Sequence, residues 1–140
     1  MTLKAITFAL VATFLYAGTA SAARPTTLAN TVWTLQTNLE ITTLTITTQG
    51  GPGAPGSAVC RVINGHFENV NVKIRGFFCP LSGKVFFVHR NLDSGDAVRV
   101  FSGSVSDKVT GQPLSMAGTM SVLISAFGDL GDYNFSATTN

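Results

Sequence analysis

The two cysteines, Cys60 and Cys79, are the residues whose chemistry is easiest to infer from this sequence. In an oxidising compartment an even pair forms a disulfide by default. A zinc site instead needs about four ligands, and no cluster of histidines accompanies the cysteines. We therefore expect a Cys60–Cys79 disulfide and no metal site. One pattern argues against the bond: if Asn64-Gly65 is a two-residue hairpin turn, the register sets Cys60 opposite Asn69 and leaves Cys79 out of reach.

Few other residues have the types and spacing that catalysis needs. His66 and His89 are the only histidines, and no serine or cysteine motif accompanies either of them. Carboxylates straddle two glycine turns, where the turn-forming role of aspartate accounts for both pairs, Asp93/Asp96 and Asp129/Asp132. We expect no catalytic residue, no cofactor and no enzymatic activity.

Arg99 is the charged residue whose orientation bears most directly on ligand binding. If Phe101 points into the protein, the two-residue period of a strand also turns Arg99 inward. A cation at a cavity mouth would suit an anionic ligand. Hydrophobicity alone indicates the reverse, with Val98 and Val100 inside and Arg99 in water. The sequence leaves both orientations open.

Four further cations fall in two neighbouring strand segments: Lys73, Arg75, Lys84 and Arg90. They could form a basic stripe, but the wet faces of the two strands explain them more simply. The net charge is +2, and eight Lys and Arg against seven Asp and Glu leave +1 without residues 1–22. Such a small charge implies no polyelectrolyte partner, so we expect no nucleic-acid binding.

Residues 1–22 have the pattern of a signal peptide. Lys4 supplies a positive charge, residues 5–18 form an uncharged apolar run, and Ala20-Ser21-Ala22 matches a cleavage site. A transmembrane anchor needs about 20 continuous apolar residues, and this run is shorter. We therefore expect a secreted or periplasmic protein that begins near Ala23 and has no membrane span after signal removal.

The rest of the chain has the composition of short strands joined by turns, with no long helix. We expect residues 23–30 to be a flexible N-terminus, residues 31–140 to form one domain, and the Gly- and Pro-rich residues 49–57 to form a mobile loop. About eight strands joined by short turns indicate an antiparallel up-and-down β-barrel, because closure removes exposed sheet edges. Alternating residues place the strands at 32–36, 41–48, 58–63, 70–75, 84–90, 97–105, 114–125 and 133–138.

Several short segments are similar to segments of one known family: Thr31-Val32-Trp33-Thr34, Val100-Phe101-Ser102-Gly103, Gly118-Thr119-Met120, and residues 128–133 with Phe135 and Ala137-Thr138. Together they resemble the avidin and streptavidin family, with patchy coverage over residues 31–138. The resemblance implies an eight-stranded barrel, often dimeric or tetrameric, with biotin in its mouth.

Residues that bind biotin in that family differ here. Leu35 stands where the family has an asparagine for the ureido oxygen, and Ser121 stands where it has a tryptophan wall. Residues 89–92 also lack a family tryptophan, and Trp33 is the only one in the chain. A polar ring buried without its partners costs about 1–3 kcal/mol for each unpaired group, so we do not expect tight biotin binding.

Two functions follow from a barrel of this size. The first is binding of a small molecule at the open end, with candidate contacts at Trp33, Leu35, Arg99, Phe101, Ser121 and Leu123. The second is a structural or protein-interaction module whose barrel is filled by its own side chains. A homo-oligomer is compatible with either. An open pocket near Trp33 would favour the first function, and a packed interior the second.

Overall fold

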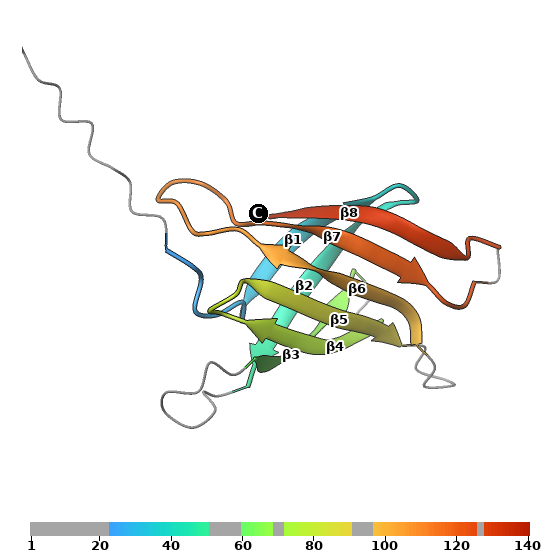
Figure 1. Cartoon of the computed structure of the whole chain (residues 1–140), viewed down its shortest axis with the longest axis horizontal. Helices are drawn as coiled ribbons and strands as arrows, with labels where there is room; N and C mark the ends of the chain where they lie inside the picture. Colours follow the sequence, from blue (N-terminus) through green and yellow to red (C-terminus); the bar gives the residue numbers. More distant parts are fainter. Residues whose placement is uncertain (1–22, 51–59, 69–71, 91–96, 126–127) are drawn as a thin grey trace, which may run out of the picture.

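The computed structural model describes residues 23–50, 60–68, 72–90, 97–125 and 128–140. Eight antiparallel strands follow one another around a closed barrel, in which β1 also pairs with β8 (Figure 1). In the described residues, no helix is long and apolar enough to cross a membrane. The prediction of an all-β, eight-stranded up-and-down barrel is confirmed. The strands are β1 (Thr31–Thr37), β2 (Ile41–Gln49), β3 (Arg61–Phe67), β4 (Lys73–Cys79), β5 (Lys84–Arg90), β6 (Ala97–Val105), β7 (Ser115–Val122) and β8 (Gly131–Thr139).

Alternation along each strand sends one set of side chains into the barrel. In β1, Trp33 and Leu35 are fully buried, whereas Val32 is 40% exposed and faces outward. In β5, Phe87 is fully buried and its neighbour Phe86 is exposed. Successive strand residues point to opposite faces, so a single register assigns every side chain to the interior or to the surface.

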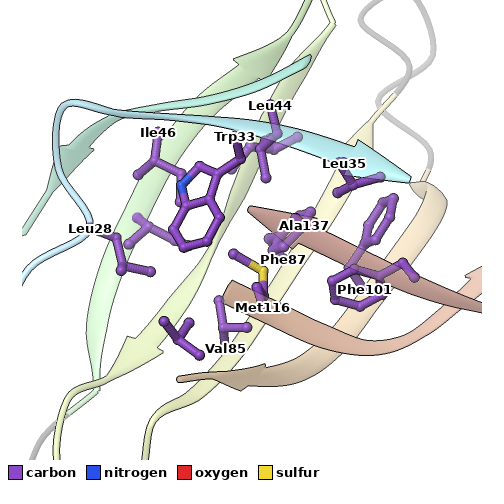
Figure 2. Packing of buried hydrophobic residues seen from close by; sticks show 14 of the residues in the cluster. Leu28, Trp33, Leu35, Leu44, Ile46, Val85, Phe87, Phe101, Met116 and Ala137 are labelled. Carbon is purple, nitrogen blue, oxygen red and sulfur yellow. The ribbon is translucent and has the colours of Figure 1, made fainter. Parts of the chain in front are cut away.

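Large apolar side chains fill the barrel interior (Figure 2). The rings of Phe87 and Phe101 stack with centroids 4.6 Å apart, and Phe135 meets Phe101 edge-on at 5.5 Å. Trp33 is fully buried, and its indole nitrogen donates a hydrogen bond of 2.7 Å to Oγ1 of Thr31. The polar atom of Trp33 is therefore already satisfied within the protein, as buried polar groups usually are.

Asn64-Gly65 lies within β3, so the predicted hairpin turn at this dipeptide is wrong. Gly65 sits where a Cβ atom would overlap the backbone of Thr45 in β2, so close strand contact explains the glycine better than a turn does. The strand runs on to Phe67, and its partner begins at Lys73. The third and fourth strands therefore lie further along the chain than predicted.

This register accounts for the disulfide. Arg61 pairs with Phe78, which sets Cys60 opposite Cys79 at the end of the same ladder. The structure contains the Cys60–Cys79 bond, so the predicted disulfide is confirmed and the alternative pairing of Cys60 with Asn69 is wrong.

Residues 23–30 pack against one end of the barrel. In this segment, for which flexibility remains a prediction, Leu28 is fully buried and its amide donates a 2.8 Å hydrogen bond to Gln49 at the end of β2. Arg24 forms an ion pair with Asp107, and Ala23 bridges to Lys108. Burial of one leucine and these polar contacts hold the segment in place. The signal-peptide prediction and most of the predicted mobile loop fall on residues 1–22 and 51–59, outside the described residues.

Candidate functional site

The two ends of the barrel differ. At one end, Leu28 and its neighbours cover the core, and we call this the Leu28 end. At the other end, side chains from the β1–β2 turn and from β2, β3, β5 and β6 surround a pocket of about 290 Å³. This pocket is called the Glu40 pocket, and it is lined by Glu40, Thr42, Phe67, Glu68, Val72, His89 and Arg99.

An ion pair between Arg99 and Glu40 lies in the pocket. Arg99 is two residues before the buried Phe101, so strand alternation places it on the inner side of β6, at the end of the barrel. The Arg99 side chain is 24% exposed and that of Glu40 39%. A pair that is partly shielded from water is screened less than a surface pair.

Thr37 holds Glu40 in position for this ion pair. The Thr37 hydroxyl oxygen accepts hydrogen bonds from the amides of Leu39 (3.1 Å) and Glu40 (3.0 Å). The Thr37 amide donates to the Glu40 carbonyl oxygen at 2.8 Å, which closes the turn between β1 and β2. A threonine side chain that bonds nearby backbone groups in this way is typical of tight turns.

His89 lies beside Arg99, because the two residues pair across β5 and β6. Its ring meets the ring of Phe67 edge-on, with centroids 5.7 Å apart. Burial lowers the pKa of His89, the positive charge of Arg99 lowers it further, and the negative charge of Glu40 opposes the shift. The imidazole is therefore neutral at pH 7. Its Nδ1 atom is buried and has no hydrogen-bond partner in the described part of the protein.

The lowered pKa of His89 predicts that acid destabilises the fold. Below the ordinary histidine pKa of about 6.5 the unfolded chain binds a proton that the folded protein resists. The free energy of unfolding should therefore fall as the pH drops from 7.5 through 6.5 toward the lowered pKa of the folded state. Urea denaturation at pH 7.5 and 5.5 measures this change, and His89→Phe should reduce it. An equal pH dependence in the variant would contradict the assignment to His89.

Of the residues proposed from the sequence for ligand contact, only Arg99 lines the Glu40 pocket. Trp33, Leu35 and Phe101 belong to the packed core. Ser121 pairs with Val100 and Asp132 on the outer side of β7, and its hydroxyl donates a 2.6 Å hydrogen bond to the Asp132 carboxylate. Leu123 follows the end of β7 and is 53% exposed. The structure therefore does not bring the six residues together.

The sequence reasoning missed most of the pocket. His89 could have been placed, because it follows the inward-facing Phe87 by two residues and so shares its side of β5. Phe67 could have been placed only with β3 in its true register. No pattern in the sequence indicated Glu40, because it lies in a turn and is separated by 59 residues from Arg99, the residue that it contacts.

In the described residues, no group of three or more histidine, cysteine, aspartate or glutamate side chains could hold a metal ion. No family model, curated protein or solved structure matches the chain. The resemblance to the avidin and streptavidin family therefore has only the segments quoted above in its support.

Proposed function

We propose that this protein is an exported, non-enzymatic barrel that binds a small uncharged polar molecule in the Glu40 pocket. The observation that carries the proposal is the buried Nδ1 atom of His89, which has no partner among the described residues. Leaving a buried polar atom unpaired costs about 1–3 kcal/mol, a cost that a ligand recovers only when its own polar group reaches Nδ1. The pocket volume of about 290 Å³ suits a small ligand.

The charges of the pocket favour an uncharged ligand over the anion that Arg99 alone suggested. Glu40 already neutralises Arg99, and Glu68 adds a second carboxylate to the lining. With His89 neutral, the pocket carries a formal charge of −1. An acidic ligand would have to displace Glu40 and then face Glu68, whereas an amide, urea or hydroxyl group could bond His89 and the ion pair together.

A filled barrel that serves as an interaction module is the second candidate. The full burial of Trp33 and the stacked phenylalanines favour it, because the protein's own side chains fill the interior of the barrel. Biotin is not the expected ligand in either case, because Leu35 and Ser121 replace the asparagine and the tryptophan that contact biotin in the family that the chain resembles. The two candidates differ in whether the native protein carries a small molecule in the Glu40 pocket.

Native mass spectrometry of protein purified from its natural source tests the proposal. We expect a fraction of the protein to carry an additional small mass, which is absent from His89→Phe purified in the same way. Thr34→Ala, on the outer side of β1, is the matched control and should retain the mass. A spectrum that shows only the mass of the chain, or an equal adduct on His89→Phe, would contradict ligand binding in this pocket.

The charge argument has a separate test in Glu40→Gln. This variant frees Arg99, so millimolar acetate should raise its melting temperature by a few degrees while leaving the native protein unchanged. Sodium chloride at equal ionic strength is the control for screening. If acetate stabilises the native protein equally, Glu40 does not occupy Arg99 as proposed.

A further inference from the structure

Two phenylalanines lie exposed on the outside of the barrel and take no part in the lining of the Glu40 pocket. Phe77 of β4 and Phe86 of β5 are direct partners in the ladder, and they are 48% and 39% exposed. Half-buried valines continue this apolar strip on both sides: Val62 pairs with Phe77, and Val100 pairs with Val88 of β5. Solvated polar side chains would normally occupy such outer positions.

Four exposed cations surround the strip, namely Lys73 and Arg75 of β4 with Lys84 and Arg90 of β5. We call the two phenylalanines, the three valines and the four cations the β4–β5 face. None of the strands β3 to β6 contains an aspartate or glutamate. Arg75 and Arg90 border a hollow of about 420 Å³ whose other walls include Phe77 and Phe86. The face therefore combines exposed apolar area with a group of exposed cations.

The opposite side of the barrel has a different surface. Most outward positions of β7, β8 and β1 carry small uncharged side chains such as Ala117, Thr119, Ser136 and Thr34, although Asp132 and Val32 also face outward. Because the strands run in sequence around a closed barrel, β1 lies diametrically opposite β5 (Figure 1). The pair of exposed phenylalanines and the four grouped cations thus lie on one side of the molecule.

The size and charge of the face disfavour a protein partner. Four strands spaced about 4.8 Å apart and a length of about 20 Å give roughly 300 Å², well below the 800 Å² that a stable interface buries on each side. A symmetric dimer through this face would also bring four cations against four more, and the strands involved supply no carboxylate to separate them.

We propose that the β4–β5 face is a peripheral docking surface for an anionic lipid membrane. Phe77, Phe86 and the valines would enter the boundary between headgroups and acyl chains, and the four cations would lie among the lipid phosphates. A soluble polyanion would use the cations but would gain little from the valines, since a hydrated chain cannot bury them. An anionic bilayer surface can bind both groups at once, because its interface buries the apolar residues and its phosphates pair with the cations.

Co-sedimentation with vesicles tests this proposal on the full chain. We expect binding to phosphatidylglycerol vesicles well above binding to phosphatidylcholine vesicles, and weaker binding as salt is raised. The apolar residues 1–22 are common to all variants, so their contribution cancels in each comparison. Phe77→Ser with Phe86→Ser should lower the phosphatidylglycerol partition coefficient at least tenfold. Arg75→Glu should lower it more than about fivefold, since removal of one cation alone costs about that factor.

Matched controls come from the other side of the barrel. Val32→Ser, on the outer side of β1, removes an equally exposed apolar side chain, and Lys108→Glu reverses a charge beyond the face. Neither should change binding more than twofold, and circular dichroism should show all variants folded. Equal binding to both kinds of vesicle, or equal losses in the controls, would overturn the proposal. Tight binding of soluble polyphosphate that is unchanged by the two serine substitutions would also overturn it. A third contradicting result is a native protein that does not bind vesicles but forms a dimer, which Arg75→Glu dissociates.

Discussion

Replacement of Trp33 by alanine should lower the free energy of unfolding by about 3–5 kcal/mol. Trp33 is fully buried within the interior packing shown in Figure 2, and its removal should leave a cavity that the surrounding strands cannot close. The hydroxyl oxygen of Thr31 also loses the 2.7 Å hydrogen bond that it accepts from the indole nitrogen. For a domain of this size the melting temperature should fall by about 10–20 °C.

Two variants sharpen this test by urea denaturation. Trp33→Phe keeps an aromatic ring in the core but loses the hydrogen bond, so it should fall between the native protein and Trp33→Ala. Val32→Ala lies next in the chain but on the outer side of β1, and it should cost less than about 1 kcal/mol. Equal effects of Trp33→Ala and Val32→Ala would show that the inner face of β1 has been assigned wrongly.

Reduction of the Cys60–Cys79 bond should lower the free energy of unfolding by about 3 kcal/mol, because the bond closes a short loop in the unfolded chain. It links neighbouring strands whose other contacts remain, so the reduced protein should still fold and should melt about 10–15 °C lower. Thermal melts with and without dithiothreitol measure the difference.

The double variant Cys60→Ser with Cys79→Ser is the control for the reducing agent. It should melt near the temperature of the reduced protein and should not respond to dithiothreitol. Titration of the denatured, unreduced native protein should find no free thiol. Two titratable thiols would mean that the pair does not form the bond.

The sequence predicted most strands because the packing signal is local. In β1 the alternation of Trp33 and Leu35 with Thr34 and Gln36 indicates both the strand and its inner side without knowledge of its neighbours. The third and fourth strands were misplaced because the sequence at Asn64-Gly65 is typical of a turn, whereas the glycine is in fact required by a contact with another strand. Gly65 is required by its close approach to Thr45, and that contact is visible only when β2 and β3 are paired.

The candidate site was harder to predict than the fold. Arg99 was identified, but its orientation depended on whether Phe101 or Val100 faces inward, and the sequence supports either. Its partner Glu40 comes from a turn whose geometry is set by the Thr37 hydroxyl. The four cations of the β4–β5 face were noted in the sequence but were assigned to the wet faces of two strands, and the exposed phenylalanines beside them were not recognised.

The pairing of β1 with β8 makes the barrel depend on residues far apart in the chain. Trp33 lies opposite Thr139, and Thr37 lies opposite Phe135. A chain synthesised from its N-terminus cannot complete this ladder until residues 135–139 have emerged. Until then the edge of β1 that pairs with β8 stays without hydrogen-bond partners, although β1 to β7 have already been synthesised. A premature stop after residue 130 would leave open edges on β1 and β7 together. Such a fragment should add strands from other copies of itself and precipitate rather than remain as a smaller folded domain.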